Sequence, residues 1–370
     1  MAPVDTKNSF GRRLGDFALN AVRKQIFIPV AALLILLVFN LIADPTFFRI
    51  TMGQNSNGDP VLSGPIITIL NNASELVILA IGMTLVTAAS GGQDISVGAT
   101  IAIAGSMMLR VLCGGEARPE TMQAPIIVAF LAACLISMFF GAFNGTLVAY
   151  FKIQPMVATL IMFTAGRSIA AWINNNTLPV INDPVFGYAG NFIPGIPIPT
   201  PVFIAIACII VIALVLKFTN LGLYAQSVGI NPNSSRLNGI NPAFIKFITY
   251  VIMGLCVAVA GYIKVSRISS INYSVIAKDI EMDAILAVAL GGNALSGGKF
   301  NMASSILGAY VIQFLTTTLY KYNVPPEALP AYKAIVVIAL VVLSAPIVRN
   351  KLSEIWKKIR APKNAVKEAN

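Results

Sequence analysis

The sequence predicts an all-α integral membrane protein with about ten transmembrane helices. Of its 370 residues, 56% are hydrophobic and only 11% are charged, whereas a soluble domain has about 25% charged residues. So few charges could not cover a water-facing surface of this size. Ten mostly apolar stretches are long enough to cross a bilayer, and no soluble domain fits between them. The predicted spans are 26–43, 66–88, 95–113, 124–149, 155–173, 201–218, 243–264, 282–297, 302–320 and 331–348.

The chain divides into a cytoplasmic amphipathic segment (1–25), one transmembrane domain (26–349) and a basic cytoplasmic tail (350–370). In the first segment, apolar residues recur at helical spacing among basic ones, which is typical of a helix lying on an anionic membrane surface. A disordered basic tail explains that segment equally well. The span 26–43 is interpreted as a retained anchor, because no small-residue cleavage pattern follows it.

Basic residues determine the predicted orientation. Five of the 26 Lys and Arg residues lie in the first segment and seven lie from Arg349 to the C-terminus. Ten crossings put both termini on one side, and the positive-inside rule makes that side the cytoplasm. The 219–242 loop then falls on the same side. The net charge of +11 therefore reflects membrane topology, and we expect no nucleic-acid partner.

Several kinds of chemistry are missing from the sequence. It contains no histidine, and its four cysteines are far apart within apolar stretches, so neither a metal site nor a cofactor is expected in this chain. It has no phosphate-binding loop of the G-x-x-x-x-G-K-[ST] form. An ATPase, if transport uses one, must be a separate polypeptide. An enzyme embedded in the membrane is disfavoured.

Three segments carry sequence signals beyond the apolar composition of a membrane span, and the first is 91–98. Gly91 and Gly92 break the helix, and Asp94 and Ser96 stand where the next helix begins, where they can cap free backbone N–H groups. Irregular backbone at membrane depth occurs only inside protein or beside water. Asp94 is therefore either a cap at a tight turn or part of a pathway or gate.

The second segment is the 219–242 loop. Asn231 followed by Pro232 is a helix-start signal, and Gly239 ends the helix after about two turns. A short capped helix is a rigid element, which suits docking to a partner protein better than it suits a plain connector.

The third segment, 281–298, starts with acidic residues at a helix N-terminus and ends in a second double-glycine break. Four residues of the first segment recur in it at a spacing of 200: Gly91, Gly92, Ser96 and Gly98 match Gly291, Gly292, Ser296 and Gly298. Chance explains this as well as an internal repeat does.

Polar side chains within the spans form the candidate pathway. Ionisable residues in lipid are costly and tend to face a bundle interior or a cavity. Each could equally make a structural hydrogen bond between helices, but as a set they indicate a hydrated path. The candidate pathway or gate residues are Asn71, Asn72, Glu75, Asp94, Ser96, Asn144, Arg167, Asp283 and Asn293.

Together the three segments resemble the permease subunits of ribose/galactose/xylose-type bacterial ABC sugar importers. Members carry Gly-Gly-x-Asp-x-Ser-x-Gly, matched at 91–98. They carry Ala-x-Gly-x-Asn-x-x-Ala-Ala-x-x-x-Gly-Ile, matched at 226–240 with serines for the two alanines. They also carry Glu-Leu-x-x-Ile-Ala followed by two glycine pairs, matched at 281–298. The galactofuranose-type permeases are a narrower likeness, because they share the 295–300 segment and the threonine run 316–318 before 324–326.

The resemblance implies a vitamin B12-importer-like (type II) permease architecture in the bacterial inner membrane. It implies a second permease subunit, the same or homologous, an ATPase pair that uses ATP and Mg²⁺, and a periplasmic binding protein that delivers a monosaccharide. By position, it makes the 219–242 loop the coupling loop to the ATPase. The residues assigned to coupling are Gly229, Asn231, Pro232, Ser235, Arg236 and Gly239.

The sequence also allows a different class of transporter. A proton-coupled secondary transporter or a channel for a small polar solute would use Glu75, Asp94 or Asp283 as the proton carrier. Asp94 and Asp283 stand at predicted helix starts, where capping explains them. A neutral sugar needs amide and hydroxyl partners more than fixed charges, and the asparagines of the spans supply them.

Overall fold

A computed structural model describes residues 26–54 and 58–344. The predicted amphipathic segment 1–25 and the basic tail 350–370 lie outside the described residues. Each predicted span contains a helix. Their bounds are α2 Phe27–Ala43, α3 Pro65–Ser90, α4 Val97–Leu112, α5 Ile126–Ala149, α6 Pro155–Ile173, α8 Thr200–Phe218, α11 Pro242–Ile268, α12 Ile280–Leu290, α13 Met302–Lys321 and α14 Leu329–Ser344. The shorter elements are η1 Pro45–Phe48, β1 Thr51–Gln54, β2 Pro60–Ser63, α7 Pro184–Gly187, α9 Leu221–Ile230 and α10 Pro232–Leu237.

Local sequence signals explain many of the helix ends. Helices α3, α6, α10 and α11 all start with proline, whose fixed φ suits the first helical turn. Helix α3 ends at Gly91, which adopts a left-handed conformation with φ of 68°. The described residues include six helices that are long and apolar enough to span a membrane (α3, α5, α6, α8, α11 and α13), and α2, α4 and part of α14 are shorter apolar helices.

The eighth predicted span is wrong in length. The prediction was 282–297, but α12 has 11 residues and ends at Leu290. Gly291 and Gly292, the latter with φ of 73°, interrupt the helix there. At 1.5 Å per residue, α12 is about 16 Å long, roughly half of a bilayer core. Helix α12 therefore cannot cross the membrane alone.

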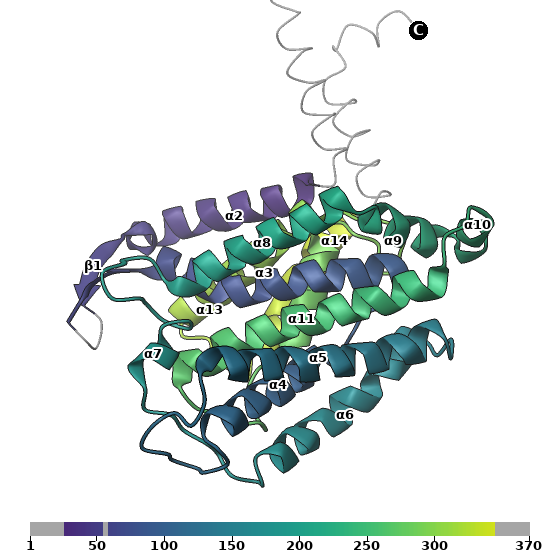
Figure 1. Cartoon of the computed structure of the whole chain (residues 1–370). Helices are drawn as coiled ribbons and strands as arrows, with labels where there is room; N and C mark the ends of the chain where they lie inside the picture. The colour runs from purple at the N-terminus through teal and green to yellow at the C-terminus, as the bar shows by residue number, and fades with distance from the viewer. Residues whose placement is uncertain (1–25, 55–57, 345–370) are drawn as a thin grey trace, which may run out of the picture.

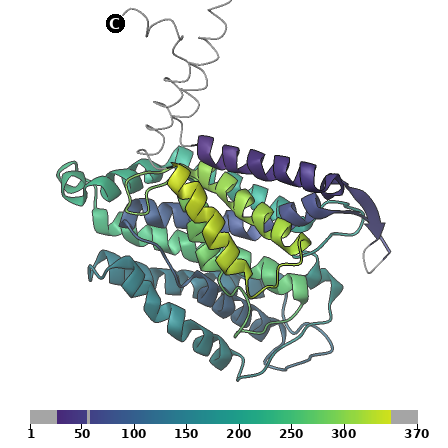
Figure 2. The same ribbon diagram turned by 180° about the vertical axis from the view of Figure 1, so that it is seen from behind.

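The helices lie side by side in one bundle (Figure 1). Helix α3 is the most enclosed long span, with 72% of its apolar window buried, whereas α8 has 17%. Helices α9 and α10 lie at one end of the bundle and the β1–β2 hairpin and α7 at the other; we name these the α10 end and the hairpin end. Figure 2 shows α14 crossing the bundle obliquely on the far side.

Helices α5 and α8 carry the apolar outer surface of the bundle. Leu131, Leu135 and Phe139 on α5, and Ile206 and Ile210 on α8, are all exposed. Large apolar side chains spread over the outer face of a long helix are stable when lipid surrounds them. These faces therefore place the bundle across a membrane.

The hairpin and η1 were not predicted from the sequence. Strand β1 pairs antiparallel with β2, with Thr51 opposite Ser63. Before them, Asp44 accepts a hydrogen bond from the Thr46 backbone N–H and caps η1. The Lys321 Nζ lies 2.7 Å from Asp44 Oδ2 and 5.0 Å from the centre of the Phe47 ring. This cluster ties the end of α2 to the end of α13.

We expect the Asp44→Asn variant to be less thermostable than the unmodified protein at neutral pH and equal to it in strong acid. Hydrogen bonds from Lys321 and then Thr46 lower the pKa of Asp44 from 3.8 to about 2. Because the folded pKa is depressed, the ion pair stabilises the protein fully above about pH 4, and this contribution is lost as the pH falls through about 2. Thermal melting in detergent across this pH range measures the difference in melting temperature between the two proteins. Lys299→Met, at an exposed lysine of the α10 end, is the control. A difference in melting temperature that stays constant with pH would contradict the prediction.

Candidate functional site

A polar chamber of about 400 Å³ lies in the half of the bundle toward the hairpin end. Helices α3, α11, α13 and α14 and the 275–283 segment form its walls. Four basic and two acidic side chains line it, with amide and hydroxyl groups between them. The lining residues are Asn72, Glu75, Leu76, Lys264, Arg267, Val275, Ala277, Lys278, Ile280, Asp283, Gln313, Thr316, Tyr320 and Lys333.

Glu75 is the most buried charge of the chamber. Its side chain is 2% exposed, and its carboxylate oxygens lie 2.8 Å from Lys264 Nζ and 2.8 Å from Arg267 Nη1. A buried carboxylate is costly unless it is paired, and two cations from α11 pair this one. The ion pairs join the two central helices, α3 and α11.

Arg267 extends this network to the surface loops. Its guanidinium also donates to Asn72 Oδ1 and Asn71 Oδ1, each at 3.2 Å. Its Nε donates to the Gly190 carbonyl oxygen at 3.2 Å, and Gly190 packs so closely on the Arg267 backbone that a Cβ would not fit. Asn71 and Asn72 therefore act as acceptors that orient Arg267.

A second ion pair closes the opposite wall. Lys333 Nζ on α14 lies 2.7 Å and 3.0 Å from the two carboxylate oxygens of Asp283 on α12. Both groups are partly buried, so solvent screens the pair less than it would at a surface. The pair holds the oblique helix α14 against the short helix α12.

Arg167 does not line the chamber. Its guanidinium donates to the carbonyl oxygens of Tyr273 at 2.8 Å and Ile276 at 3.0 Å. Val275 and Ala277, between and beside these residues, form part of the chamber wall. Arg167 therefore holds the wall from α6 rather than facing the cavity.

Asp94, Ser96 and Asn144 form a buried hydrogen-bonded cluster toward the α10 end. Asn144 Nδ2 donates to Ser96 Oγ at 2.9 Å, and the Ser96 hydroxyl donates to Asp94 Oδ1 at 2.6 Å. The Ser96 backbone N–H donates to the same oxygen at 2.9 Å. Asp94 thus closes the turn before α4, whose N-cap residue is Ser96 and has no side-chain cap, so the helix-capping alternative is not confirmed. A gate role for it stays a prediction.

The two double-glycine breaks pack against each other. The Gly298 N–H donates to the Ala88 carbonyl oxygen at 3.1 Å, and Gln93 Nε2 donates to the Leu295 carbonyl oxygen at 2.9 Å. A Cβ on Gly91 would lie 2.8 Å from the Ser296 carbonyl oxygen. The recurrence at a spacing of 200 thus marks two segments that touch, whatever its origin.

Helix α9 completes this contact. Gly229, near its end, packs so closely on the Ala88 carbonyl oxygen that it leaves no space for a side chain, and a Cβ there would also lie 2.6 Å from the Gly298 nitrogen. We call the meeting point of Ala88, Gly91, Gly229, Gly297 and Gly298 the glycine junction. Through it, α9 touches the last turn of α3 and the end of the 281–298 segment.

Asn293 fixes the second broken segment to its neighbours. Its amide donates to Ser305 Oγ at 2.8 Å, and its carbonyl oxygen accepts from the Asn301 N–H at 2.7 Å. Ser305 Oγ also accepts from Thr84 Oγ1 at 2.8 Å. Asn293 therefore ties the 291–301 turn to α13 and α3 and lies outside the chamber.

Helix α10 confirms the local prediction for the 219–242 loop. Asn231 Oδ1 accepts from the N–H groups of Asn233 at 3.0 Å and Ser234 at 3.1 Å, and the helix starts with Pro232. After it, Gly239 adopts φ of 79°. Leu237, the last residue of α10, is 89% exposed, and α10 lies at the tip of its end of the bundle (Figure 1). The coupling role of these residues stays a prediction.

Sequence reasoning missed all four basic members of the chamber: Lys264, Arg267, Lys278 and Lys333. The sequence does carry signals for Lys264 and Arg267. A buried acid in a span requires a cation nearby, and Arg267 follows the seventh predicted span on the exported side, where the positive-inside rule disfavours basic residues. Their pairing with Glu75 explains why they lie there. Lys333 had no comparable signal.

A multi-pass helical bundle with a polar chamber and a projecting capped helix defines a membrane permease. The family described as branched-chain amino acid transport system / permease component matches residues 66–345. Relatives include the galactofuranose transporter permease protein YtfT of Escherichia coli, 39% identical, covering 85% of this chain and 88% of the relative. The ribose import permease protein RbsC of E. coli is 33% identical, covering 94% and 99%. The chain therefore belongs to the family of ABC sugar-importer permeases.

Two further comparisons concern another sugar permease and a solved transporter structure. The fructose import permease protein FruF of Bifidobacterium longum is 35% identical, covering 91% of this chain and 92% of the relative. A solved metal-chelate type ABC transporter in an inward-facing conformation has a TM-score of 0.40 and 14% identity, covering 80% of this chain and 85% of that one. The vitamin B12-type arrangement stays a prediction.

Proposed function

We propose that the chain forms the translocation pathway for a monosaccharide in an ATP-driven importer. The chamber is the observation that carries this proposal. It combines Asn72, Gln313, Thr316 and Tyr320, which can exchange hydrogen bonds with sugar hydroxyls, with four basic and two acidic side chains, and both acids are paired. Since relatives are named for galactofuranose, fructose and ribose transport, galactofuranose is the first sugar to test.

The partners follow from the same proposal. A separate ATPase pair, using ATP and Mg²⁺, would bind the exposed α10 helix, and a periplasmic binding protein would deliver sugar at the hairpin end. A second permease, the same or homologous, would complete the pathway. This orientation puts the α10 end and both termini on the cytoplasmic side of a bacterial inner membrane.

The glycine junction supports a route for coupling. ATP binding in the partner would move α10 and, with it, α9. Because Gly229 packs on the backbone of Ala88 in α3 and of Gly298, α9 could not shift without moving both. Helix α3 lines the chamber and Gly298 lies between α12 and α13, so the movement would reach the helices around the chamber.

Proton coupling is the weaker alternative, since its three candidate carriers are already engaged. Glu75 pairs with two cations, Asp283 with one, and Asp94 accepts hydrogen bonds from Ser96. Each of the three carboxylates therefore has a structural contact that accounts for it without a proton-carrying role.

Co-purification and uptake test the proposal. The tagged chain in mild detergent should recover a P-loop ATPase, and Arg236→Ala combined with Leu237→Ala should remove it. Labelled galactofuranose uptake in cells should survive an uncoupler while ATP is kept high. If uptake collapses with the uncoupler, or if no ATPase is recovered even after crosslinking in native membranes, proton coupling is the better account.

A further inference from the structure

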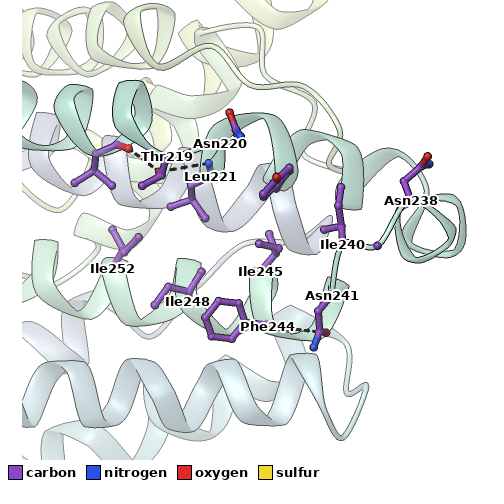
Figure 3. Close-up of a pocket in the computed structure, with 13 residues that line it drawn as sticks. Thr219, Asn220, Leu221, Asn238, Ile240, Asn241, Phe244, Ile245, Ile248 and Ile252 are labelled. Carbon is purple, nitrogen blue, oxygen red and sulfur yellow. Dashed lines mark hydrogen bonds between the residues drawn. The ribbon is translucent and has the colours of Figure 1, made fainter.

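A groove of about 620 Å³ opens between α8, α9 and α11 near the α10 end (Figure 3). Its walls are apolar and include Val215, Leu221, Ile248 and Ile252. Four polar residues lie at its rim: Thr219, Asn220, Asn238 and Asn241. The groove is thus apolar within and rich in amides at its mouth.

The groove lies on the lipid-facing side of the bundle. One of its walls is α8, whose Ile210, Val211 and Leu214 are exposed, and Phe244 on the α11 wall is 51% exposed. Water in such a space would find few hydrogen-bond partners on the walls. In a membrane, a hydrocarbon chain is the occupant that matches these walls.

Charge at this end favours an anionic headgroup. The described residues of the α10 end include Lys152, Lys217, Arg236, Lys246 and Lys299. The one acid described there, Asp94, is 3% exposed and bonded to Ser96. Basic residues at a membrane surface attract anionic lipids, and the exposed acids Glu116 and Glu120 lie at the opposite, hairpin end of the bundle.

The rim offers donors for a phosphate. Asn241 Oδ1 accepts from the N–H groups of Ala243 at 3.1 Å and Phe244 at 3.2 Å, so the carbonyl of this amide is used and its NH₂ group can donate. Lys217 lies between the lining residues Val215 and Thr219 in sequence, and Lys246 directly follows the lining residue Ile245. Neither lysine lines the groove, but both lie on its wall helices α8 and α11, within one turn of lining residues.

We propose that this groove binds an anionic phospholipid of the adjoining leaflet. One acyl chain lies between α8 and α11, and the phosphate lies at the asparagine rim. The site is separate from the chamber and does not depend on which solute the protein carries. Because α9 forms one wall, the lipid also packs against the helix that leads to the glycine junction.

The test uses the purified full chain in nanodiscs of phosphatidylcholine with or without phosphatidylglycerol, followed by lipid quantification after delipidation in detergent. The unmodified protein should retain phosphatidylglycerol and melt at a higher temperature in its presence. Ile248→Trp fills the groove and should lower retention at least tenfold. Leu255→Trp, on the same helix outside the groove lining, should retain lipid normally.

A charge variant keeps the test decisive if Ile248→Trp folds poorly. Lys217→Gln with Lys246→Gln leaves the groove intact and should weaken retention by about fivefold per lysine removed, as expected for basic residues at an anionic surface. Equal retention by all variants, or no preference for phosphatidylglycerol over phosphatidylcholine, would overturn the proposal. So would crosslinking of a cysteine at Ile248 to a co-purified ATPase instead of to lipid.

Discussion

Replacing Glu75 with glutamine is expected to abolish transport and to destabilise the protein by about 3 kcal/mol, the usual cost of breaking a buried ion pair. The amide keeps the size of the side chain but removes the charge that Lys264 and Arg267 share. Two partly buried cations on the same helix, α11, would then repel each other without a counter-charge. Thermal melting in detergent and sugar uptake in reconstituted vesicles measure the two effects.

A second substitution separates charge balance from a direct role in transport. Lys264→Met in the Glu75→Gln background removes one of the unpaired cations, so it should recover part of the lost stability. Glu120→Gln, at an exposed acid of the hairpin end, should leave both measurements unchanged. If the Glu75→Gln variant melts and transports normally, the ion pairs do not organise the chamber.

The Gly229→Ala variant is expected to lose at least tenfold in uptake while it still binds the ATPase. The added methyl group would overlap the Ala88 carbonyl oxygen and crowd the Gly298 nitrogen. Backbone atoms cannot rotate away as a side chain can, so α9 must shift at a cost of about 1–3 kcal/mol. Uptake, ATPase activity and co-purification of the partner, measured on one preparation, show whether binding and coupling separate.

The matched control is Gly222→Ala in the same helix. There a Cβ would meet the side-chain atoms of Phe300 at 3.2 Å and Leu216 at 3.3 Å, and both side chains can adjust. The two variants gain the same helix propensity, so a difference between them isolates the junction. Normal uptake by Gly229→Ala would remove the proposed coupling route, and loss of ATPase binding would move the defect to docking.

The sequence alone predicted the membrane class and most of the helices, because those depend on local signals. Apolar length identified the spans, and proline, asparagine and glycine marked several helix ends. The capped helix α10 followed from Asn231, Pro232 and Gly239, and the structure shows it. The three motifs also indicated the family of sugar-importer permeases, which the comparisons confirm.

One wrong helix length and one omission from the candidate site are explained by the local sequence. Helix α12 was predicted too long because apolar residues continue after Gly291 and Gly292. These two glycines nevertheless end the helix at Leu290. Lys264 and Arg267 were left out of the candidate site because each lies at the end of a span, where a basic residue usually marks the membrane surface.

Only the tertiary structure decided which polar residues belong together. Asn71, Asn72, Glu75 and Asp283 lie at or beside the chamber, whereas Asp94, Ser96 and Asn144 form a separate cluster, and Asn293 holds a turn. Arg267 and Asn72 are 195 residues apart in the chain. Contacts at such separations depend on how helices pack and not on any local propensity, so hydropathy and capping signals cannot predict them. The same reason explains why the sequence did not predict the contact of Gly91 with Ser296, which lie 205 residues apart.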